Sequence, residues 1–467
     1  MSLSHDVVGA LAAGPLRGPE LMQRLSISQP TLSRTLAKLP DEVVAMGRGR
    51  SRRYAARRSV LGARFPAGVP IYRIEADATV RLLGQMHPIA PAGYWWEDTR
   101  KPAKSRRYLE ETPWWLADLF PAGYLGRLFA RRFAERGLPA DPRLWSMDHL
   151  IGTLATHSLH DQVGNLVVGE TARQRFLEER AGHHLPRFPE RSAQRAEDYE
   201  RLAEQLAAGD PHGSSAAGEQ PKFAARYRNG QGRQASFLVK FSPPLESDEG
   251  QRWSDLLLAE SLALRQLENL DISAAEARYL RGPRRAFLES ARFDRTPQGG
   301  RRSIMSFISL SMAFTGVAQG WIPATQALIE AEQLPPSVLA VVRRLTAYAI
   351  LVGNNDRHLG NLSTVHDGGQ PRLAPIYDML PMAYAPSRAQ GLRHTPLAAE
   401  ELQQSLAGIC PKLAPDELQR VQQAAVAFWA ALAIHPEISA PFRDIARMNG
   451  ERLAPPLPPP QTKKGPA

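Results

Sequence analysis

The feature that most constrains this chain is a polar cluster that directly follows an apolar segment. Leu345, Tyr348 and Val352 recur at the spacing of one helix face, and the apolar segment stops at Gly353. The residues that follow, at 354–361, are Asn-Asn-Asp-Arg-His-Leu-Gly-Asn. Polar side chains at the end of a buried helix are costly to place unless they line a site. The pattern therefore predicts a functional loop.

The spacing within this loop indicates phosphoryl transfer. Asn361 stands five residues after Asp356, and Asp378 follows an expected strand further on. In protein kinases the first aspartate of such a set positions a hydroxyl nucleophile, while the asparagine and the second aspartate hold magnesium on the ATP phosphates. Asp356 is thus the candidate catalytic residue, and Asn361 and Asp378 are candidate metal ligands.

This chemistry also requires a lysine on a strand. Phe223–Tyr227 and Ser236–Phe241 are expected strands joined by an Asn-Gly turn, which is a strong hairpin signal. Lys240 lies among apolar neighbours in the second strand, where an ammonium group is costly without an anionic partner. Trp253–Leu267 has helical spacing and carries Glu260, which is either the partner of Lys240 or an ordinary surface carboxylate.

A loop that covers phosphates is also needed, and residues 210–222 are a candidate because small residues dominate them. The loop is neither a Walker A motif nor the eukaryotic kinase glycine loop, so by itself it reads as a surface turn. Strands are further expected at Tyr279–Leu280 and Ala286–Glu289. We interpret Leu288–Ala291 as a hinge whose backbone binds adenine, which adds Glu289 to the nucleotide site.

The first residues of the chain have the pattern of a winged helix-turn-helix. Helices are expected at His5–Ala13, from Pro19 onward and at Gln29–Leu39, followed by strands at Val43–Met46 and Arg53–Ala56. The polar face of the third helix and the turn between the strands can reach bases and phosphates. The candidate DNA-binding residues are Gln29, Thr31, Ser33, Arg34, Lys38, Arg48, Arg50, Arg52 and Arg53.

The placement of charge also favours DNA as a partner. The net charge is +11, and residues 43–74 contain eight arginines and no acidic residue. Such a one-sided run is typical of a surface that contacts a phosphate backbone, although a solvated arginine-rich face has the same composition.

Other features of the chain are less specific. A group of tryptophans is either a stacking surface for bases or, as we favour, part of a core. Residues 170–210 are expected to form a solvated helix pair, and the proline-rich end to be disordered. Some histidines lie near Asp161, but their spacing matches no metal-ligand motif. The tryptophans are Trp95, Trp96, Trp114, Trp115 and Trp145, and the histidines are His149, His157 and His160.

Several classes of protein are excluded or disfavoured. Cys410 is the single cysteine, so an internal disulfide and a cysteine-cluster metal site are ruled out. The longest apolar run, Ala424–Ile434, is too short to span a bilayer. The amino terminus lacks a basic n-region, so we expect no signal peptide and a cytoplasmic protein.

Together these motifs resemble the HipA family of bacterial serine/threonine kinases, the toxins of toxin–antitoxin modules. The amino-terminal module is most similar to the YjjJ branch of that family, also called HipH. The matching motifs are SAAGEQPK at 215–222, FLVKF at 237–241, AE at 259–260, ARFDR at 291–295, GNNDRHLGN at 353–361 and YDML at 377–380.

The resemblance implies an α+β fold, with a winged helix-turn-helix followed by a two-lobed kinase-like fold that has a β-rich small lobe and an all-α large lobe. It implies five regions along the chain. These are a DNA-binding domain at 1–65, a HipA amino-terminal subdomain at 66–170, linker helices and the small lobe at 171–300, the helical large lobe at 301–453 and the tail at 454–467.

The resemblance also implies roles for residues, with ATP and Mg²⁺ as cofactors. Lys240 contacts the phosphates and the loop that ends at Lys222 covers them. Ser215 falls where family members carry an autophosphorylated serine, whose added charge repels ATP phosphates and switches activity off. The implied ATP-binding residues are Ala217, Gly218, Glu219, Gln220, Pro221, Lys222, Lys240, Glu289, His358, Asn361, Tyr377 and Asp378.

The expected function is that of an ATP- and magnesium-dependent serine/threonine protein kinase fused to a DNA-binding module. In the family the substrate is typically an aminoacyl-tRNA synthetase, and a separate antitoxin is a further expected partner. The alternatives are a DNA-binding regulator that uses the kinase-like fold as a nucleotide sensor, and an enzyme that acts on DNA. The chain departs from the family pattern at Pro221, where an acidic residue is common, and from eukaryotic kinases after Asp378, where Met-Leu replaces Phe-Gly.

Overall fold

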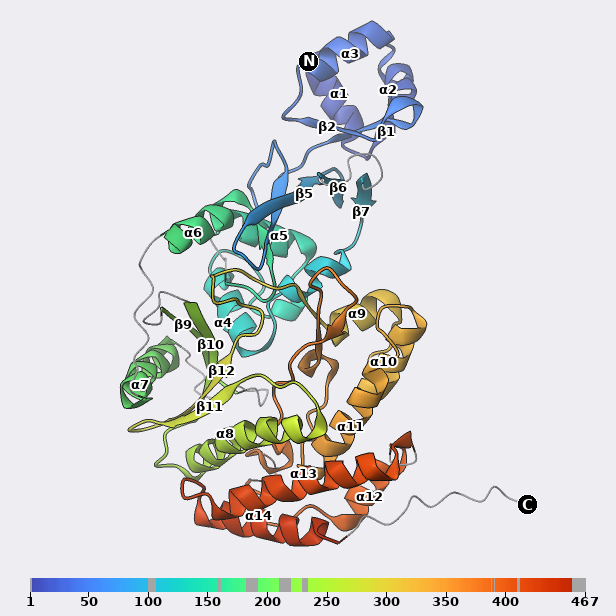
Figure 1. The fold of residues 1–467 in the computed structure, drawn as a ribbon. Coiled ribbons are helices and arrows are strands. Elements are labelled where there is room, and N and C mark those ends of the chain that lie inside the picture. Colours follow the sequence, from blue (N-terminus) through green and yellow to red (C-terminus); the bar gives the residue numbers. More distant parts are fainter. Residues whose placement is uncertain are drawn as a thin grey trace, which may run out of the picture. The chain divides into compact units, whose positions relative to one another are not determined.

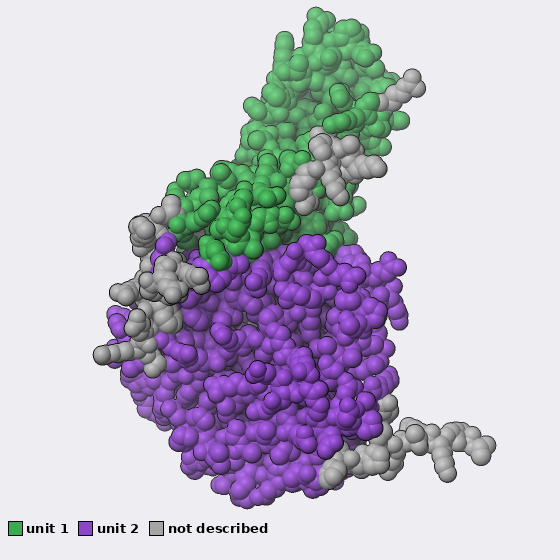
Figure 2. Space-filling view, in the orientation of Figure 1, with its two compact units in different colours: residues 1–121, 129–184, 298–301 green, residues 122–128, 185–297, 302–467 purple. Residues whose placement is uncertain are grey.

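The computed structural model separates the chain into two compact units, coloured differently in Figure 2. Unit 1 consists of residues 1–121, 129–184 and 298–301, and unit 2 of residues 122–128, 185–297 and 302–467. The residues that the structure describes are 2–99, 106–157, 161–181, 192–209, 220–228, 234–387, 389, 391–409 and 412–455.

Unit 1 begins with three short helices and a small antiparallel sheet of strand order β1-β3-β2 (Figure 1). Val7, Leu11, Leu21 and Leu32 are buried between them, which agrees with the leucine pattern of the sequence. The elements are α1 (Leu3–Leu11), β1 (Leu16–Arg17), α2 (Gly18–Leu25), α3 (Gln29–Ala37), β2 (Val43–Met46), the 3₁₀ turn η1 (Gly49–Ser51) and β3 (Arg53–Ala56).

The rest of unit 1 is built on a five-stranded antiparallel sheet of order β7-β6-β5-β4-β8. Its apolar face packs against helices, and Trp95, Trp96 and Trp145 are buried, which confirms core packing for these three tryptophans. The elements are β4 (Val69–Ile74), β5 (Val80–Pro88), β6 (Tyr94–Asp98), β7 (Arg106–Leu109), η2 (Trp114–Leu119), α4 (Gly123–Ala134, which both units share), η3 (Pro142–Leu144), α5 (Met147–Thr156), β8 (Leu166–Val168) and α6 (Glu170–Ala181).

Two arginines of the basic run are structural parts of unit 1. The Arg58 guanidinium donates to both carboxylate oxygens of Asp148, at 2.6 and 2.8 Å. An Nη atom of Arg57 lies 2.6 Å from Nδ1 of His87. Because Arg57 and Arg58 already have partners within the fold, fewer arginines of residues 43–74 are available to contact a ligand than the sequence indicates.

Unit 2 contains a four-stranded antiparallel sheet of order β11-β12-β10-β9 with a helix on each face. Phe287 faces α7 and its neighbour Leu288 faces α8, as the alternation of side chains along a strand requires. All four strands overlap the predicted ones. The elements are α7 (Ser192–Gly209), β9 (Lys222–Arg228), β10 (Gln234–Phe241), α8 (Asp248–Gln266), η4 (Leu267–Leu270), β11 (Ala277–Arg281) and β12 (Ala286–Ala291).

The prediction of a solvated helix pair at residues 170–210 is wrong for α7. Arg195, Tyr199 and Ala203 are fully buried against the sheet. Nε of Arg195 donates to Oε1 of Glu289 at 2.8 Å, and the Tyr199 hydroxyl donates to the same oxygen at 2.7 Å. A charge can be buried in this way because its partner is buried with it and hydrogen-bonded.

The remainder of unit 2 is mostly helical, as predicted, with a small sheet of order β13-β14-β15. None of the helices within the described ranges is long and apolar enough to cross a membrane. The elements are β13 (Ile304–Ser306), α9 (Phe307–Phe314), α10 (Trp321–Glu330), α11 (Val338–Leu351), η5 (Leu359–Asn361), β14 (Ser363–Val365), β15 (Arg372–Leu373), η6 (Met382–Tyr384), α12 (Ala399–Ala407), α13 (Pro415–Ile434) and α14 (Ala440–Leu453).

Candidate active site

The polar loop leaves the end of α11, a helix whose last turns are buried. Gly353 has φ of 78°, a left-handed conformation that glycine adopts without steric cost, and it turns the chain out of the helix. The Asn354 N–H then donates to the Ala349 carbonyl at 2.8 Å and closes the helix end. The predicted transition from apolar helix to polar loop is confirmed.

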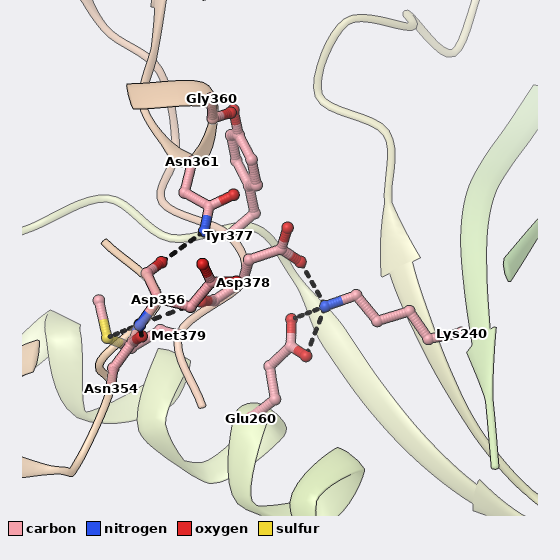
Figure 3. Close-up of polar contacts among 9 residues, drawn as sticks. All are labelled: Lys240, Glu260, Asn354, Asp356, Gly360, Asn361, Tyr377, Asp378 and Met379. Atoms are coloured by element: carbon pink, nitrogen blue, oxygen red, sulfur yellow. Dashed lines mark hydrogen bonds and ion pairs between the residues drawn. The ribbon is translucent and has the colours of Figure 1, made fainter. Parts of the chain in front are cut away.

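Three charged side chains from separate parts of unit 2 meet beside this loop (Figure 3). Nζ of Lys240, on β10, lies 2.6 and 2.7 Å from the two carboxylate oxygens of Glu260, on α8. The same ammonium group forms an ion pair with Asp378. Lys240 is 4% exposed and Glu260 1% exposed. The expected Lys240–Glu260 pair is therefore confirmed, and Glu260 is not a surface carboxylate.

The electrostatics of this cluster keep Lys240 and Asp378 charged. Burial by itself would lower the pKa of Lys240, but Asp378 and Glu260 outweigh it and raise that pKa above its ordinary value. Burial likewise acts to raise the pKa of Asp378, but the positive charges of Lys240 and Lys222 hold it at about 2. The cluster thus offers an ammonium group and a carboxylate at neutral pH.

One buried amide connects the catalytic loop to the Asp378 segment. Oδ1 of Asn354 accepts the Asp356 N–H at 3.0 Å, and Nδ2 of Asn354 donates to the Asp378 carbonyl at 3.2 Å. Asn354 is 1% exposed. Asp378 has φ of 55°, which is uncommon for a residue other than glycine and is typical of functional sites. The hydrogen bond from Asn354 helps to hold that conformation.

The side-chain amide of Asn361 also stabilises the catalytic loop. Nδ2 of Asn361 donates to the Asp356 carbonyl at 2.8 Å, so its amide oxygen is the atom left for a ligand. In Figure 3 this oxygen points to the side on which Asp378 lies. The side chain of Asp356 is open to solvent by contrast: it is 50% exposed, with His358 Nε2 3.9 Å from Oδ1.

Tyr377 lies between Asp378 and the loop. Its hydroxyl donates to the Gly360 carbonyl at 2.8 Å, and its ring stacks on Phe293 at a centroid distance of 5.8 Å. The structure therefore brings together Lys240, Asp356, His358, Asn361, Tyr377 and Asp378, six of the predicted site residues, within unit 2.

The phosphate loop is described only at its end. Ser215, Ala217, Gly218 and Glu219 lie outside the described residues. Gln220 is buried, the Pro221 carbonyl accepts the Phe241 N–H at 3.1 Å, and Lys222 pairs with Lys240 across β9 and β10. The described end of the loop therefore runs alongside the lysine strand.

Glu289 does not lie where the hinge hypothesis placed it. It is in the middle of β12, which pairs with β10 on one side and β11 on the other. Its carboxylate faces α7 and is bound by Arg195, whereas its neighbour Leu288 faces α8, the helix that carries the partner of Lys240. Side chains of successive strand residues point to opposite faces, so the Glu289 carboxylate and Lys240 are on opposite sides of the sheet.

Two residues with structural roles were not predicted from the sequence: Asn354 in the catalytic loop, and Arg195 on the face of the sheet opposite Lys240. A signal for Asn354 was present, because an asparagine two residues before an aspartate commonly accepts that residue's N–H in an Asx turn. Arg195 had no local signal, since its partner Glu289 lies 94 residues away.

The predicted DNA-binding residues lie on two elements of unit 1, the helix α3 and the turn between β2 and β3. Gln29, Ser33, Arg34 and Lys38 are exposed on and just after α3, and Thr31 is half-buried. Arg48, Arg52 and Arg53 are exposed at the turn between β2 and β3, and the side chain of Arg50 lies outside the described part.

Comparison with known proteins gives the class and then the family. Residues 214–432 match the model of the HipA-like C-terminal domain, which defines the class of unit 2. Residues 65–177 match the middle domain of YjjJ-like toxins. The chain is 34% identical over 454 residues to Toxin YjjJ of Escherichia coli (strain K12), covering 96% of this chain and 97% of that protein. The chain belongs to the family of YjjJ-like, HipA-related toxins, as the motifs predicted.

A solved structure shares the fold. A chain in the complex of HipA, HipB and operator DNA from the Shewanella oneidensis MR-1 toxin–antitoxin system matches with a TM-score of 0.50 and 14% identity, over 82% of this chain and 95% of that chain. The Helicobacter pylori proinflammatory kinase CtkA matches over 50% of this chain and 90% of its own, at 14% identity and a TM-score of 0.32, too low to support an argument.

Proposed function

We propose that the chain is a protein kinase that transfers the γ-phosphoryl group of ATP to a serine or threonine hydroxyl of another protein. The observation that carries this proposal is the cluster of Lys240, Glu260 and Asp378 beside a loop that presents Asp356 and Asn361. These are the parts that phosphoryl transfer requires: a cation for the phosphates, oxygen ligands for metal and a carboxylate for the nucleophile.

Each residue has a defined role in this proposal. Mg²⁺ and ATP supply the transferable phosphoryl group and the charge that neutralises it. Asn361 and Asp378 offer only oxygen ligands, which suit Mg²⁺ because that ion keeps water and phosphate in the rest of its shell. Glu260 orients Lys240 toward the phosphates, and the exposed Asp356 carboxylate accepts a hydrogen bond from the acceptor hydroxyl.

The test is transfer of label from [γ-³²P]ATP by the full chain. Magnesium-dependent incorporation into protein, lost in EDTA, is the expected result. Phosphate on Ser215, read by mass spectrometry, would in addition show the autophosphorylation that the family resemblance predicts. Absence of any magnesium-dependent transfer or ATP turnover would overturn the proposal.

The bridge formed by Asn354 leads to a specific prediction. Asn354→Ala is expected to lower kcat by about 100-fold and to leave the KM for ATP nearly unchanged, because small misplacements of a catalytic group have effects of that size. Steady-state kinetics with varied ATP measures both quantities.

The matched control is Asn449→Ala. Asn449 is also 1% exposed, accepts the Leu397 N–H at 2.8 Å and donates to the Tyr384 hydroxyl at 2.7 Å, in the same unit. Both variants should lose thermal stability, but only Asn354→Ala should lose kcat. An equal loss of kcat in both would mean that Asn354 is merely structural.

We further propose that residues 1–65 form a winged helix-turn-helix that binds DNA. Support comes from two features of this region, the exposed polar side of α3 and the exposed arginines of the β2–β3 turn. The Shewanella complex contains HipB and operator DNA. In this proposal the chain carries its own DNA-binding module, and a separate antitoxin is a further partner.

Salt dependence tests the DNA proposal. The triple variant Arg48→Ala/Arg52→Ala/Arg53→Ala is expected to weaken binding to all duplexes. The slope of log K against log salt should become shallower by about 0.9 for each phosphate that the variant no longer neutralises. Fluorescence anisotropy across a salt series measures this slope. Arg447→Ala, which removes an exposed arginine of α14, should leave it unchanged. An unchanged slope in the triple variant would exclude the turn from the interface.

A DNA-binding regulator that uses the kinase-like fold as a nucleotide sensor is the second candidate. The exposed arginines of the β2–β3 turn favour it. It differs from the kinase proposal in one result, since it requires ATP to change DNA affinity without any transfer of phosphate.

A further inference from the structure

The longest uncharged segment of the chain is fastened to the catalytic loop. Residues 303–329 contain no Asp, Glu, Lys, Arg or His, in a chain of which 22% is charged. The Phe307 N–H, at the start of α9, donates to the Leu362 carbonyl at 2.9 Å. The Trp321 indole N–H, at the start of α10, donates to the His358 carbonyl at 2.9 Å. The segment is thus anchored on both sides of α9 to residues that flank Asn361.

One side of α9 is apolar and exposed to solvent. Phe307 and Leu310 are buried and hold the helix in place, whereas Ile308 is 48% exposed and Met312 65% exposed. These last two are four residues apart and therefore lie on the same face of the helix. Phe314, in the last turn, is 38% exposed. Phe314 is two residues from Met312 and therefore lies on another side of the helix, so we call Ile308 and Met312 alone the α9 face.

This concentration of exposed apolar groups is unusual for the described part of the chain. The described residues include eleven large hydrophobic residues that are exposed, and three of these are on α9, a helix of eight residues. Apolar side chains exposed singly are common in soluble proteins, but a group at a site indicates an interaction surface.

We propose that the α9 face docks an extended apolar segment of the protein substrate beside its acceptor hydroxyl. This inference rests on the proposed kinase function and specifies its substrate class. A substrate whose hydroxyl reaches Asp356 must approach the loop to which α9 is bonded. Because residues 303–329 lack charge, a Lys, Arg, Asp or Glu of the substrate that docks on the α9 face would lose its hydration without gaining a partner from this segment.

The position of the α9 face favours the substrate over other occupants. A second copy or an antitoxin has no need to bind at the catalytic loop, whereas a substrate does. The structure thus assigns to this kinase a preference for apolar residues around the acceptor, and not the basic or acidic flanks that charged grooves select.

The test uses the full chain, Mg²⁺-ATP and a dephosphorylated peptide library made from a bacterial proteome, with phosphosites read by mass spectrometry. Enrichment of Leu, Ile, Val, Met or Phe near the phosphosite is expected. The double variant Ile308→Glu/Met312→Glu should lose this enrichment and at least tenfold in kcat/KM for the best peptide, with an unchanged KM for ATP. Ile434→Glu alters an exposed isoleucine at the end of α13 in the same way, and should behave as wild type.

The outcomes separate the two proposals. If the wild-type chain transfers no phosphate to itself or to any peptide, the kinase function itself fails. If it phosphorylates itself but no peptide, or selects charged flanks, or if the double variant keeps wild-type kcat/KM, only the docking proposal is overturned. A changed sedimentation coefficient in the double variant with unchanged selectivity would instead assign the α9 face to contacts between copies.

Discussion

Asp356→Asn is expected to lower the rate of phosphate transfer by about 10³-fold while the fold survives. Loss of a positioned carboxylate that accepts the hydroxyl proton has effects of about 10²- to 10⁴-fold. The Asp356 N–H and carbonyl are held by Asn354 and Asn361, and its half-exposed side chain makes no buried contact, so the amide replaces it without strain. Initial rates with labelled ATP, together with the thermal midpoint, measure both effects.

The matched control for this variant is Asp367→Asn. Asp367 is an exposed aspartate of the same unit that pairs with Arg372 at 2.8 Å, away from the loop. It should keep the wild-type rate. Wild-type transfer by Asp356→Asn would refute the assignment of Asp356, whatever the control shows.

Lys240→Met is expected to remove both activity and a large part of the stability. Without the ammonium group, Glu260 and Asp378 face each other with no cation between them. Removing one partner of a buried ion pair destabilises a protein by about 3–5 kcal/mol. Urea unfolding at pH 7 measures the loss in the free energy of unfolding, and [γ-³²P]ATP measures the loss of transfer.

The destabilisation should depend on pH in a defined direction. The pKa of Asp378 is about 2 in the folded wild type, below its ordinary 3.8, so its pairing stabilises the fold above pH 3.8 and this contribution is lost as the pH falls toward 2. The pKa of Lys240 is raised above its ordinary 10.5, so its contribution is present below pH 10.5. The difference between wild type and Lys240→Met should therefore be largest between these limits and should shrink in acid, where the carboxylates are protonated.

A second substitution distinguishes the buried-charge explanation from simple loss of packing. Lys240→Met/Glu260→Gln removes one of the two unpaired carboxylates and should regain stability relative to Lys240→Met, without regaining activity. If the double variant is no more stable than the single one, the loss comes from packing and not from charge.

Much of the candidate site was predictable because its signals are local. Lys240 in an apolar strand requires an anion whatever the rest of the fold, and Glu260 was the predicted partner. The strands of unit 2 follow from alternation and a turn signal, and the structure has them close to the predicted bounds. The six motifs between residues 215 and 380 together predicted the family, which the likeness to Toxin YjjJ confirms.

Other features depend on pairs of residues that are distant in the sequence. Arg195 lies in a segment whose charges resemble those of a solvated helix, and only its contact with Glu289 makes it part of a core. The same contact places the Glu289 carboxylate on the face of the sheet opposite Lys240. Arg58 belongs to a run of arginines, but its partner Asp148 makes it structural.

The sequence by itself determined which chemical groups the site contains, because residue type and spacing within one loop or strand are sufficient to predict them. Only the tertiary structure decided which groups meet. In the sequence Asn354 is one of several polar residues of the loop. Its hydrogen bond to the Asp378 carbonyl, 24 residues away, exists only because of the fold. The uncharged segment became a surface because α9 buries Phe307 and leaves Met312 in solvent. Burial and pairing depend on long-range packing, which no local pattern records.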